Sequence, residues 1–408
     1  MALLETLTHF DAPTGFAAGV NSTTAKLNSR KQFLTELGVL NRVGVKQDGI
    51  TVEGDTLFIG GRPLSALNAQ LREQGAGELT LIPTSTFCRA LGKTYGQLLE
   101  TGLNLINPPP VPGLLGDKAM QYWELYGTTL AVPPWQPIEP YLSEDGTGFR
   151  ELQTAFIEDA PLVLKARSST HGDGIWFYPE GVTAVIEDWQ QGTAPTAFLE
   201  APQTFLLQYA VPHTFDRRII AAGETPVSGE DRYGSPHTDR SNLNLVSTEA
   251  RTPRGAAEEL LARGAVEPLN MERIDPAVER AVSDLHEALA ALAGLPPREF
   301  HSWIGWDFLV VDPEDERLRT IPDDVLTGLL RERYRTREGR YLVFGEGNLS
   351  PGSKERYVNA VAHGRSGLRW DSAANLLNYG LSISTGTTFE PGFPALLDRD
   401  AVLTAYGL

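Results

Sequence analysis

The chain has 408 residues, of which 41% are hydrophobic and 21% charged, and its formal net charge is −17. This composition is typical of a globular protein with enough length for two or three domains, and it excludes a disordered chain. The single cysteine, Cys88, excludes internal disulfides and cysteine-based zinc clusters and fits a reducing compartment. Because the negative charge repels nucleic-acid backbones at long range, we expect no general nucleic-acid binding.

The sequence pattern also predicts no membrane partner. No apolar run approaches the roughly 20 residues that a membrane span requires. The opening MALLETLTHFDAPTG lacks the basic start and the apolar core of a signal peptide. We therefore expect a cytoplasmic protein.

Short strand-like and helix-like segments alternate in the first hundred residues, which predicts an α/β domain. Strands are expected at 39–45, 56–60 and 79–82, and a helix at 63–73. Asn107 and three prolines then end both strand and helix and mark a boundary. The first predicted domain is therefore 1–115.

A small α+β unit is predicted over 116–203, and a larger one over 204–408. The second unit is expected to hold a helix at 117–126 and strands at 131–132, 162–166 and 175–178; the third opens with strands at 204–210 and 218–222. The charge-rich segment 312–340 separates two apolar strands and is predicted to be an insertion.

The clearest helix is expected from Asp275 to Ala293. Asp275 is a good N-cap, Pro276 suits the first turn and Gly294 ends the helix. Val278, Val282, Leu285, Leu289 and Leu292 recur at helical spacing and predict its buried face. His286 is expected at the surface.

The segment PLVLKARSSTHGDGIW places Lys165 in an apolar strand directly before a loop with Gly172 and Gly174. A buried ammonium without a counter-charge can lose about 3 to 5 pKa units, so such a strand is expected to supply an anion. The glycines allow the loop 168–174, which includes Ser169, to turn backbone N–H groups toward phosphate oxygens. The alternative is an ordinary hairpin with an exposed lysine.

A second polar stretch, in TFLLQYAVPHTFDRRIIAAG, joins two apolar strands. Gln208, Tyr209 and Val211 end the first strand, and the backbone groups of the last two are candidates for reading an adenine edge. Asp216 or His213 would reach the ribose, and an arginine on the returning strand would face the reacting phosphate or carboxylate. The alternative is an edge strand followed by a solvated turn.

Three candidate ligands of a hard cation lie in two apolar segments: Asp307 in HSWIGWDFLVV, and Glu346 with Asn348 in YLVFGEGNLSPG. A spacing of two places Glu346 and Asn348 on one face of a strand, where their oxygens can share Mg²⁺ with ATP phosphates. Burial of both acids without a cation would be costly. The alternative is that each acid lies at a strand end.

Together these segments resemble the ATP-grasp superfamily of carboxylate–amine ligases, which includes glutathione synthetase-like, D-alanine ligase-like and ribosomal-protein glutamate ligase-like enzymes. The resemblance runs from about Asn107 to Gly352. Its most specific motif is Glu-Gly-Asn-Leu-Ser-Pro-Gly from Glu346, which is similar to the family's Glu-x-Asn-x-Ser-Pro-Gly. Asp117-Lys118 resembles the pair that opens a helix in the family, and RSNLN at 240–244 resembles a stretch of the glutamate ligase-like branch.

The resemblance implies a mixed α/β and α+β ATP-grasp fold, with an N-terminal α/β domain, a small central lid subdomain and a C-terminal subdomain. It implies that Lys118 and Lys165 bind ATP phosphates, that the stretch 208–211 holds adenine, and that Arg218 faces an acyl phosphate. It also assigns Mg²⁺ to Asp307, Glu346 and Asn348. Because the insertion separates Asp307 from Glu346 more widely than in the family, Asp323 or Asp324 is an alternative ligand.

The function implied by the resemblance is an ATP- and Mg²⁺-dependent ligase. It would join a small-molecule carboxylate to an amine of an amino acid or peptide through an acyl phosphate, with Arg218 and Lys165 as catalytic residues. A small-molecule kinase and a non-catalytic ATP-binding regulator are the alternatives, and homo-oligomerisation is left open.

Overall fold

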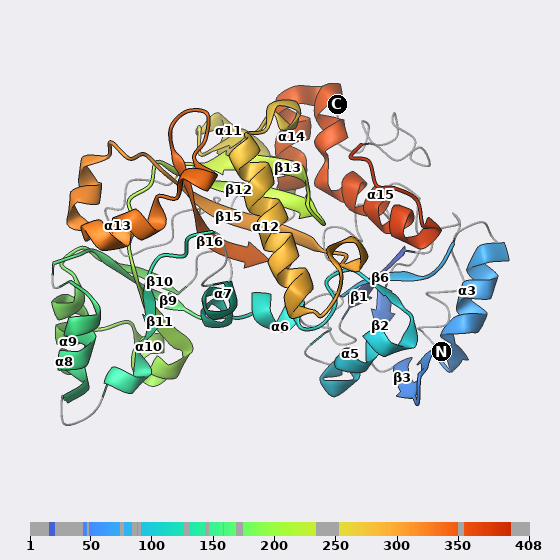
Figure 1. Ribbon diagram of the computed structural model, residues 1–408, viewed down its shortest axis with the longest axis horizontal. Coiled ribbons are helices and arrows are strands. Elements are labelled where there is room, and N and C mark those ends of the chain that lie inside the picture. The colour runs from blue at the N-terminus through green and yellow to red at the C-terminus, as the bar shows by residue number, and fades with distance from the viewer. Residues whose placement is uncertain are drawn as a thin grey trace.

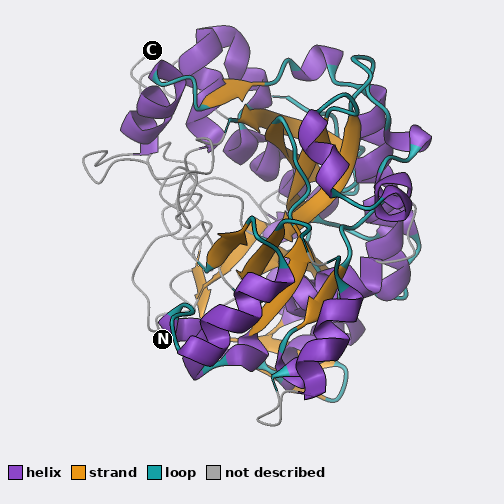
Figure 2. Ribbon diagram, turned by 90° about the vertical axis from the view of Figure 1, so that its left-hand side faces the viewer, coloured by secondary structure: helices purple, strands orange, loops and turns teal. Residues whose placement is uncertain are grey.

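The computed structural model describes residues 16–20, 44–46, 49–73, 77–83, 88, 91–125, 130–142, 147–157, 159–168, 174–233, 253–349 and 355–392. In these ranges the chain forms four β-sheets with helices packed against them (Figures 1 and 2). None of the described helices is both long and apolar enough to cross a membrane.

The N-terminal part holds a parallel sheet and a small antiparallel one. The parallel sheet has the order β2-β1-β6-β7, formed by Gly44–Lys46, Phe16–Val20, Thr80–Pro83 and Asn104–Leu105. The antiparallel sheet consists of β3 (Ile50–Glu53), β4 (Thr56–Ile59) and β5 (Arg62–Pro63), and α3 (Leu64–Glu73) and α5 (Lys93–Gln97) follow. The strands predicted at 56–60 and 79–82 and the helix at 63–73 are confirmed; most of 39–45 lies outside the described residues.

The predicted boundary at Asn107 is a left-handed residue with φ 58°. Its N–H donates to the His301 carbonyl (2.8 Å), and its side-chain amide exchanges hydrogen bonds with the backbone N–H and C=O of Trp303 (2.8 and 3.1 Å). Asn107 therefore joins the N-terminal part to the first strand residue of a distant sheet. Helices α6 (Val111–Leu115) and α7 (Lys118–Leu125) follow it.

The central sheet is antiparallel, in the order β10-β9-β11-β8. Its strands are Ile175–Tyr178, Leu162–Ala166, Phe205–Tyr209 and Trp135–Pro137, and α8 (Thr147–Ala155), α9 (Val182–Gln191) and α10 (Thr196–Glu200) cover one face. The strands expected at 162–166, 175–178 and 204–210 are confirmed. The strand expected at 131–132 is wrong, because Pro133 and Pro134 follow it and pairing begins only at Trp135.

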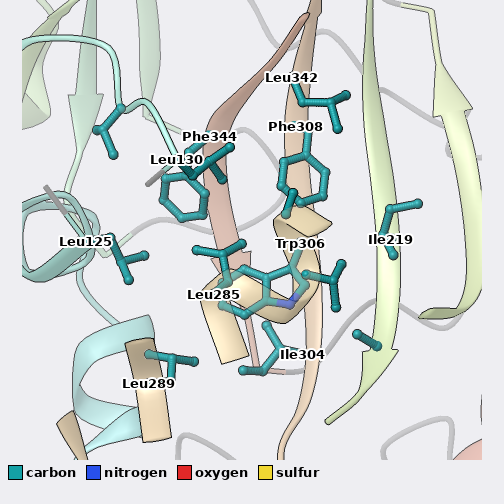
Figure 3. Close-up of a cluster of buried hydrophobic side chains, with 14 of the residues drawn as sticks. Leu125, Leu130, Ile219, Leu285, Leu289, Ile304, Trp306, Phe308, Leu342 and Phe344 are labelled. Carbon is teal, nitrogen blue, oxygen red and sulfur yellow. The ribbon is translucent and has the colours of Figure 1, made fainter. Parts of the chain in front are cut away.

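The largest sheet has five antiparallel strands in the order β14-β13-β12-β15-β16. They are Val266–Pro268, Thr225–Arg232, Phe215–Ala222, Trp303–Val311 and Tyr341–Asn348. Helix α12 (Pro276–Leu292) crosses one face, where Leu285 and Leu289 meet Ile304, Trp306 and Phe308 (Figures 1 and 3). This face is the main hydrophobic core.

The helix predicted at 275–293 is confirmed, including the Asp275 N-cap (Oδ1 accepts from the Ala277 N–H, 2.8 Å) and Gly294 in the left-handed region (φ 68°). The surface position expected for His286 is wrong. The residue is 4% exposed, and its ring nitrogens lie 3.2 Å from Ser302 Oγ and 3.0 Å from the Pro297 carbonyl oxygen. The polar partners make burial of the imidazole tolerable.

Two further regions complete the described chain. Between β15 and β16, α13 (Asp323–Leu329) packs Val325 and Leu326 against the cores of both the central and the five-stranded sheet. Three helices lie near β13 and β14, at the opposite edge of the five-stranded sheet: α11 (Pro253–Ala262), α14 (Glu355–His363) and α15 (Ser372–Thr385). Helix α15 contacts both β6 and β12. Because β11 belongs to the central sheet, a domain division after residue 203 would separate this strand from its neighbours.

Short 3₁₀ helices connect these elements. They span Leu98–Thr101, Glu139–Tyr141, Pro202–Thr204, Met271–Arg273, Pro297–Glu299, Glu316–Thr320, Glu332–Tyr334 and Gly364–Trp370.

Candidate nucleotide and metal site

On the face of the five-stranded sheet opposite α12, four charged residues are direct cross-strand partners. Glu230, Arg218, Asp307 and Glu346 follow one another across β13, β12, β15 and β16. Arg218 donates from Nε and Nη2 to the two oxygens of Asp307 (2.6 and 2.5 Å). Arg232 donates to Glu230 (2.8 Å) and lies 3.7 Å from Asp307. This charged row is what a side-chain period of two produces when one face of a sheet is core and the other is a site.

A bulge in β16 decides which way Glu346 points. Phe344 pairs with Phe308, but Glu346 pairs with the adjacent Asp307, so Gly345 is an extra residue in the strand. Without the bulge, Glu346 would share the core face with Phe344, because residues two apart lie on the same side. A Cβ at Gly345 would lie 2.8 Å from the Asp307 carbonyl oxygen, so the bulge requires glycine.

The three predicted metal ligands lie together. Asn348 Nδ2 donates to Asp307 Oδ2 (3.1 Å) and to Glu346 Oε1 (3.2 Å). Rotating this amide by half a turn brings its oxygen to the same place, which gives two carboxylates and an amide oxygen as donors for a hard cation. The described residues hold no cluster of three or more acidic, histidine or cysteine side chains suited to a metal. A divalent cation would therefore need Asn348 and oxygens of a bound ligand, as Mg²⁺ commonly does.

The alternative ligands Asp323 and Asp324 lie elsewhere. Both are exposed in the first turn of α13, and Asp324 acts electrostatically on Tyr209. They are not part of the group formed by Asp307, Glu346 and Asn348.

Lys118 reaches this group from helix α7. The Lys118 side chain is buried, and its Nζ lies 3.4 Å from Glu346 Oε2. Asp117 caps the helix by accepting from the Ala119 N–H (2.9 Å) and also holds the Arg167 guanidinium through both carboxylate oxygens (3.1 and 2.7 Å). Since Arg167 directly follows β9, this pair ties the start of α7 to the strand that carries Lys165.

Lys165 projects from the face of the central sheet opposite its helices. Its Nζ donates to Gln208 Oε1 (2.7 Å) and lies 6.0 Å from the centre of the Tyr122 ring. The pKa of Lys165 is lowered to about 8, chiefly by burial and with a smaller contribution from the nearby Lys118 charge, while Glu346 and Asp216 act in the opposite direction. An anion bound between the two lysines would relieve their mutual repulsion.

The same cations act on Glu346. Burial alone would raise the pKa of its carboxyl, but Lys118, Arg218 and Lys165 and the hydrogen bond from Asn348 hold it below the usual value. Glu346 is therefore ionised at neutral pH. The site combines anionic metal-ligand oxygens with two lysines, as a complex of a cation and a polyphosphate requires.

In the stretch 208–211, which is predicted to hold adenine, polar groups already form hydrogen bonds within the protein. Gln208 donates to the Pro133 carbonyl (3.0 Å), and the N–H groups of Tyr209 and Val211 donate to the carbonyls of Pro134 and Tyr209 (3.2 and 3.1 Å). The Val211 N–H would have to leave its local turn to read a base. The Gln208 side chain accepts a hydrogen bond from Lys165 and so helps to position this lysine.

His213 and Asp216 form a pair beside this stretch, with His213 Nε2 3.1 Å from Asp216 Oδ1. Burial alone would lower the pKa of His213, but Asp216 raises it; burial would likewise raise the pKa of Asp216, but His213 lowers it. The remaining predicted site residues are placed as follows: Gly174 has φ 74° just before β10, whereas Ser169, Gly172 and residues 240–244 lie outside the described residues.

Sequence reasoning missed several residues of this site. Gln121 and Tyr122 on α7 bond the backbone of Gly347 and Gly345 on either side of Glu346, and Arg167 after β9 binds Asp117. On β13, Arg232 lies near Asp307, and Glu230 is the cross-strand partner of Arg218. Gln121 and Tyr122 follow Lys118 by three and four residues, which places them on one helix face. This spacing is the signal that could have found them.

No family model matches the chain. A tRNA dimethylallyltransferase of Granulibacter bethesdensis is 28% identical over 165 residues, which are 40% of this chain and 46% of that enzyme. The chain thus spans less than half the length of this curated relative.

Solved structures match over most of the chain. D-alanyl-alanine synthetase A from Vibrio cholerae has a TM-score of 0.50 at 12% identity, covering 92% of this chain and 98% of that one. D-cycloserine synthetase DcsG has 0.49 at 13% identity, covering 90% and 99%. ATP-grasp ligase PsnB, solved with a phosphomimetic precursor variant, Mg and ADP, has 0.49 at 11%, covering 92% and 100%. The chain has the ATP-grasp fold, so the fold predicted from the sequence is confirmed.

Proposed function

We propose that the protein is an ATP- and Mg²⁺-dependent ligase that joins a carboxylate to an amine through an acyl phosphate. The proposal rests on one observation: Lys118 lies 3.4 Å from Glu346, Lys165 interacts electrostatically with the same carboxylate, and Glu346 is grouped with Asp307 and Asn348. Positive charge for phosphates and oxygen ligands for a divalent cation thereby lie in one place.

In the proposed reaction, a carboxylate oxygen of the donor bonds to the γ-phosphorus of ATP as the bond to ADP breaks. The amine nitrogen then attacks the acyl carbon and loses a proton, and phosphate leaves. Bound Mg²⁺ supplies charge compensation to the phosphate oxygens. Asp307, Glu346 and Asn348 would hold the ion, and Lys118 and Lys165 would neutralise the transferred group.

Arg218 is the proposed contact to the acyl phosphate. Its guanidinium is bound through two hydrogen bonds to Asp307, so its position is fixed before any substrate arrives. Fixed donors aimed at developing charge are the largest contribution to most phosphoryl and acyl transfers. Gln208, Tyr209, Val211 and Asp216 are proposed to line the nucleoside end, with Ser169, Gly172 and Gly174 in the phosphate loop.

The test is phosphate release from ATP in the presence of pairs of amino acids and peptides. We expect release to require both a carboxylate and an amine and to fall at least about 100-fold in Lys165→Ala and Glu346→Gln. Matched controls are Lys93→Ala and Glu279→Gln, since both residues are exposed on helices away from the site. Full activity in both site variants would contradict the assignment.

The two alternatives give different results in the same assay. A kinase would transfer phosphate to a single hydroxyl-bearing substrate and leave a stable phosphorylated product. A regulator would bind Mg-ATP without turnover in any mixture.

A further inference from the structure

β16 is an edge strand of the five-stranded sheet, and it carries Glu346 and Asn348. An edge strand presents one row of backbone N–H and C=O groups without a neighbouring strand. In a buried position these groups need other partners. At this edge, side chains of α7 supply hydrogen-bond partners for the backbone of β16.

Gln121 takes the place of a neighbouring strand at Gly347. Its Oε1 accepts from the Gly347 N–H (2.8 Å), and its Nε2 donates to the Gly347 carbonyl (3.1 Å). The same Nε2 also donates to the Leu115 carbonyl (2.9 Å), and Gln121 as a residue is 2% exposed. A Cβ at Gly347 would lie 2.6 Å from the Trp306 ring and 2.9 Å from the Leu115 side chain, so this position requires glycine.

Tyr122 bonds the same edge at the bulge. Its hydroxyl donates to the carbonyl of Gly345, the extra residue that turns Glu346 toward the site (2.9 Å). The fully buried Tyr122 ring packs against Trp135 and Phe344, and the Gln208 side chain also hydrogen-bonds its hydroxyl. One face of the ring lies below Lys165 at 6.0 Å. Tyr122 therefore interacts with Lys165, with Gln208 and with the backbone of the strand that holds Glu346.

We propose that Gln121 and Tyr122 are positioning residues that dock helix α7 onto the edge of β16 and so fix Glu346 for cation binding beside Lys118. Neither residue contacts substrate in this assignment. The Tyr122 hydroxyl fixes the bulge, and its ring supports Lys165. The inference rests on the proposed function, because it assigns Glu346 to Mg²⁺.

The hydroxyl is tested by Tyr122→Phe, which keeps the ring. ADP affinity is measured by calorimetry with and without Mg²⁺. We expect the tightening of ADP binding by Mg²⁺ to shrink about tenfold, as loss of one buried hydrogen bond to the bulge predicts. Affinity for ADP without Mg²⁺ should stay within about twofold, since the ring below Lys165 remains.

The matched control is Tyr334→Phe. Tyr334 is also fully buried, and its hydroxyl donates to Asp284 far from the site (2.5 Å). We expect it to lower the unfolding temperature like Tyr122→Phe while leaving the effect of Mg²⁺ unchanged. A second variant, Tyr122→Leu, removes the ring and should weaken ADP binding in both conditions. Gln121→Leu should reproduce the reduced effect of Mg²⁺.

Three outcomes distinguish the claims. An unchanged effect of Mg²⁺ in Tyr122→Phe, with tightening in the wild type, overturns this inference and leaves the proposed function standing. An equal reduction in Tyr334→Phe also overturns it, because a general loss of rigidity would then suffice. A wild type that binds no ADP in either condition overturns the proposed function and this inference together.

Discussion

Adjacent arginines on β12 make the same bidentate pair on opposite faces of one sheet. Arg218 binds Asp307 on the site face at 2.6 and 2.5 Å, and Arg217 binds Asp231 on the other face at 2.7 and 2.8 Å. The two pairs are nearly equally buried, with side-chain exposures of 12% and 12% against 11% and 8%. Neither geometry nor burial therefore distinguishes them.

The surroundings distinguish the pairs. Around Arg218 and Asp307 lie two lysines, Glu346 and Asn348, whereas the groups acting on Arg217 and Asp231 include further acids, namely Glu338, Asp275 and Glu267. The second pair balances an acidic edge and ties β12 to β13. A functional charged residue is therefore distinguished from a structural one by the groups that surround it.

The largest effect is expected when each of the two arginines is replaced by methionine. Arg218→Met should lower ligase turnover at least about 100-fold, because it removes a fixed cation from the reacting group. Arg217→Met should keep turnover within a few-fold but cost about 3 kcal/mol of unfolding free energy, because Asp231 is left buried and unpaired. Urea denaturation and phosphate release, measured where both variants are folded, check the two effects. Equal losses of turnover would remove the distinction between the faces.

The pH dependence of nucleotide binding is the next effect. Burial lowers the pKa of Lys165 to about 8, so the lysine is charged below this pH and neutral above it. ADP affinity should therefore fall as the pH rises through 8, by up to about tenfold per pH unit. Calorimetry from pH 7 to 9.5 measures it. Lys165→Met should bind ADP more weakly but with little pH dependence, and a wild-type affinity that rises above pH 8 would contradict the assignment.

On the α12 face of the sheet, the titrating group is His286, and its protonation affects the free energy of unfolding. Burial lowers the pKa of His286 below the value it has in the unfolded chain, so the unfolded state binds the additional proton. The contribution to stability is present above the unfolded pKa of about 6.5 and is lost as the pH falls through the lower, folded-state pKa. Urea unfolding from pH 7.5 to 5 should show this loss, and His286→Gln should reduce it. An equally steep loss in His286→Gln would assign it to other groups.

Helices and strands with a clear local pattern could be predicted from the sequence more completely than the arrangement of the site residues. The helix at α12 and strands β9 and β10 follow from local patterns of apolar spacing, caps and turns, and they were predicted with nearly correct bounds. Asp307, Glu346 and Asn348 were expected to lie together because their motif resembles a known family. Their convergence depends on the bulge at Gly345, which alternation along the strand does not reveal.

Contacts between distant segments could not be predicted from these patterns. Gln121 acts as a strand partner of Gly347, 226 positions away, although a glutamine on a helix is ordinarily a surface residue. The burial of His286 could not be predicted either, because its hydrogen-bond partners, Ser302 and Pro297, come from the connection between α12 and β15. In both cases a polar side chain is buried because tertiary structure supplies its hydrogen bonds.

The smallest expected effect concerns the start of α12, which supports the core face without contacting the site. Asp275 accepts from the Ala277 N–H with Oδ1 and from the Arg337 N–H with Oδ2 (2.8 and 2.7 Å), so it holds both the helix and the end of the insertion. Asp275→Ala should cost about 1 kcal/mol of unfolding free energy, as loss of an N-cap does, and leave turnover unchanged. Asp275→Ser keeps a capping oxygen and should recover part of that stability. Loss of turnover in Asp275→Ala at full stability would mean that the two faces of the sheet are coupled.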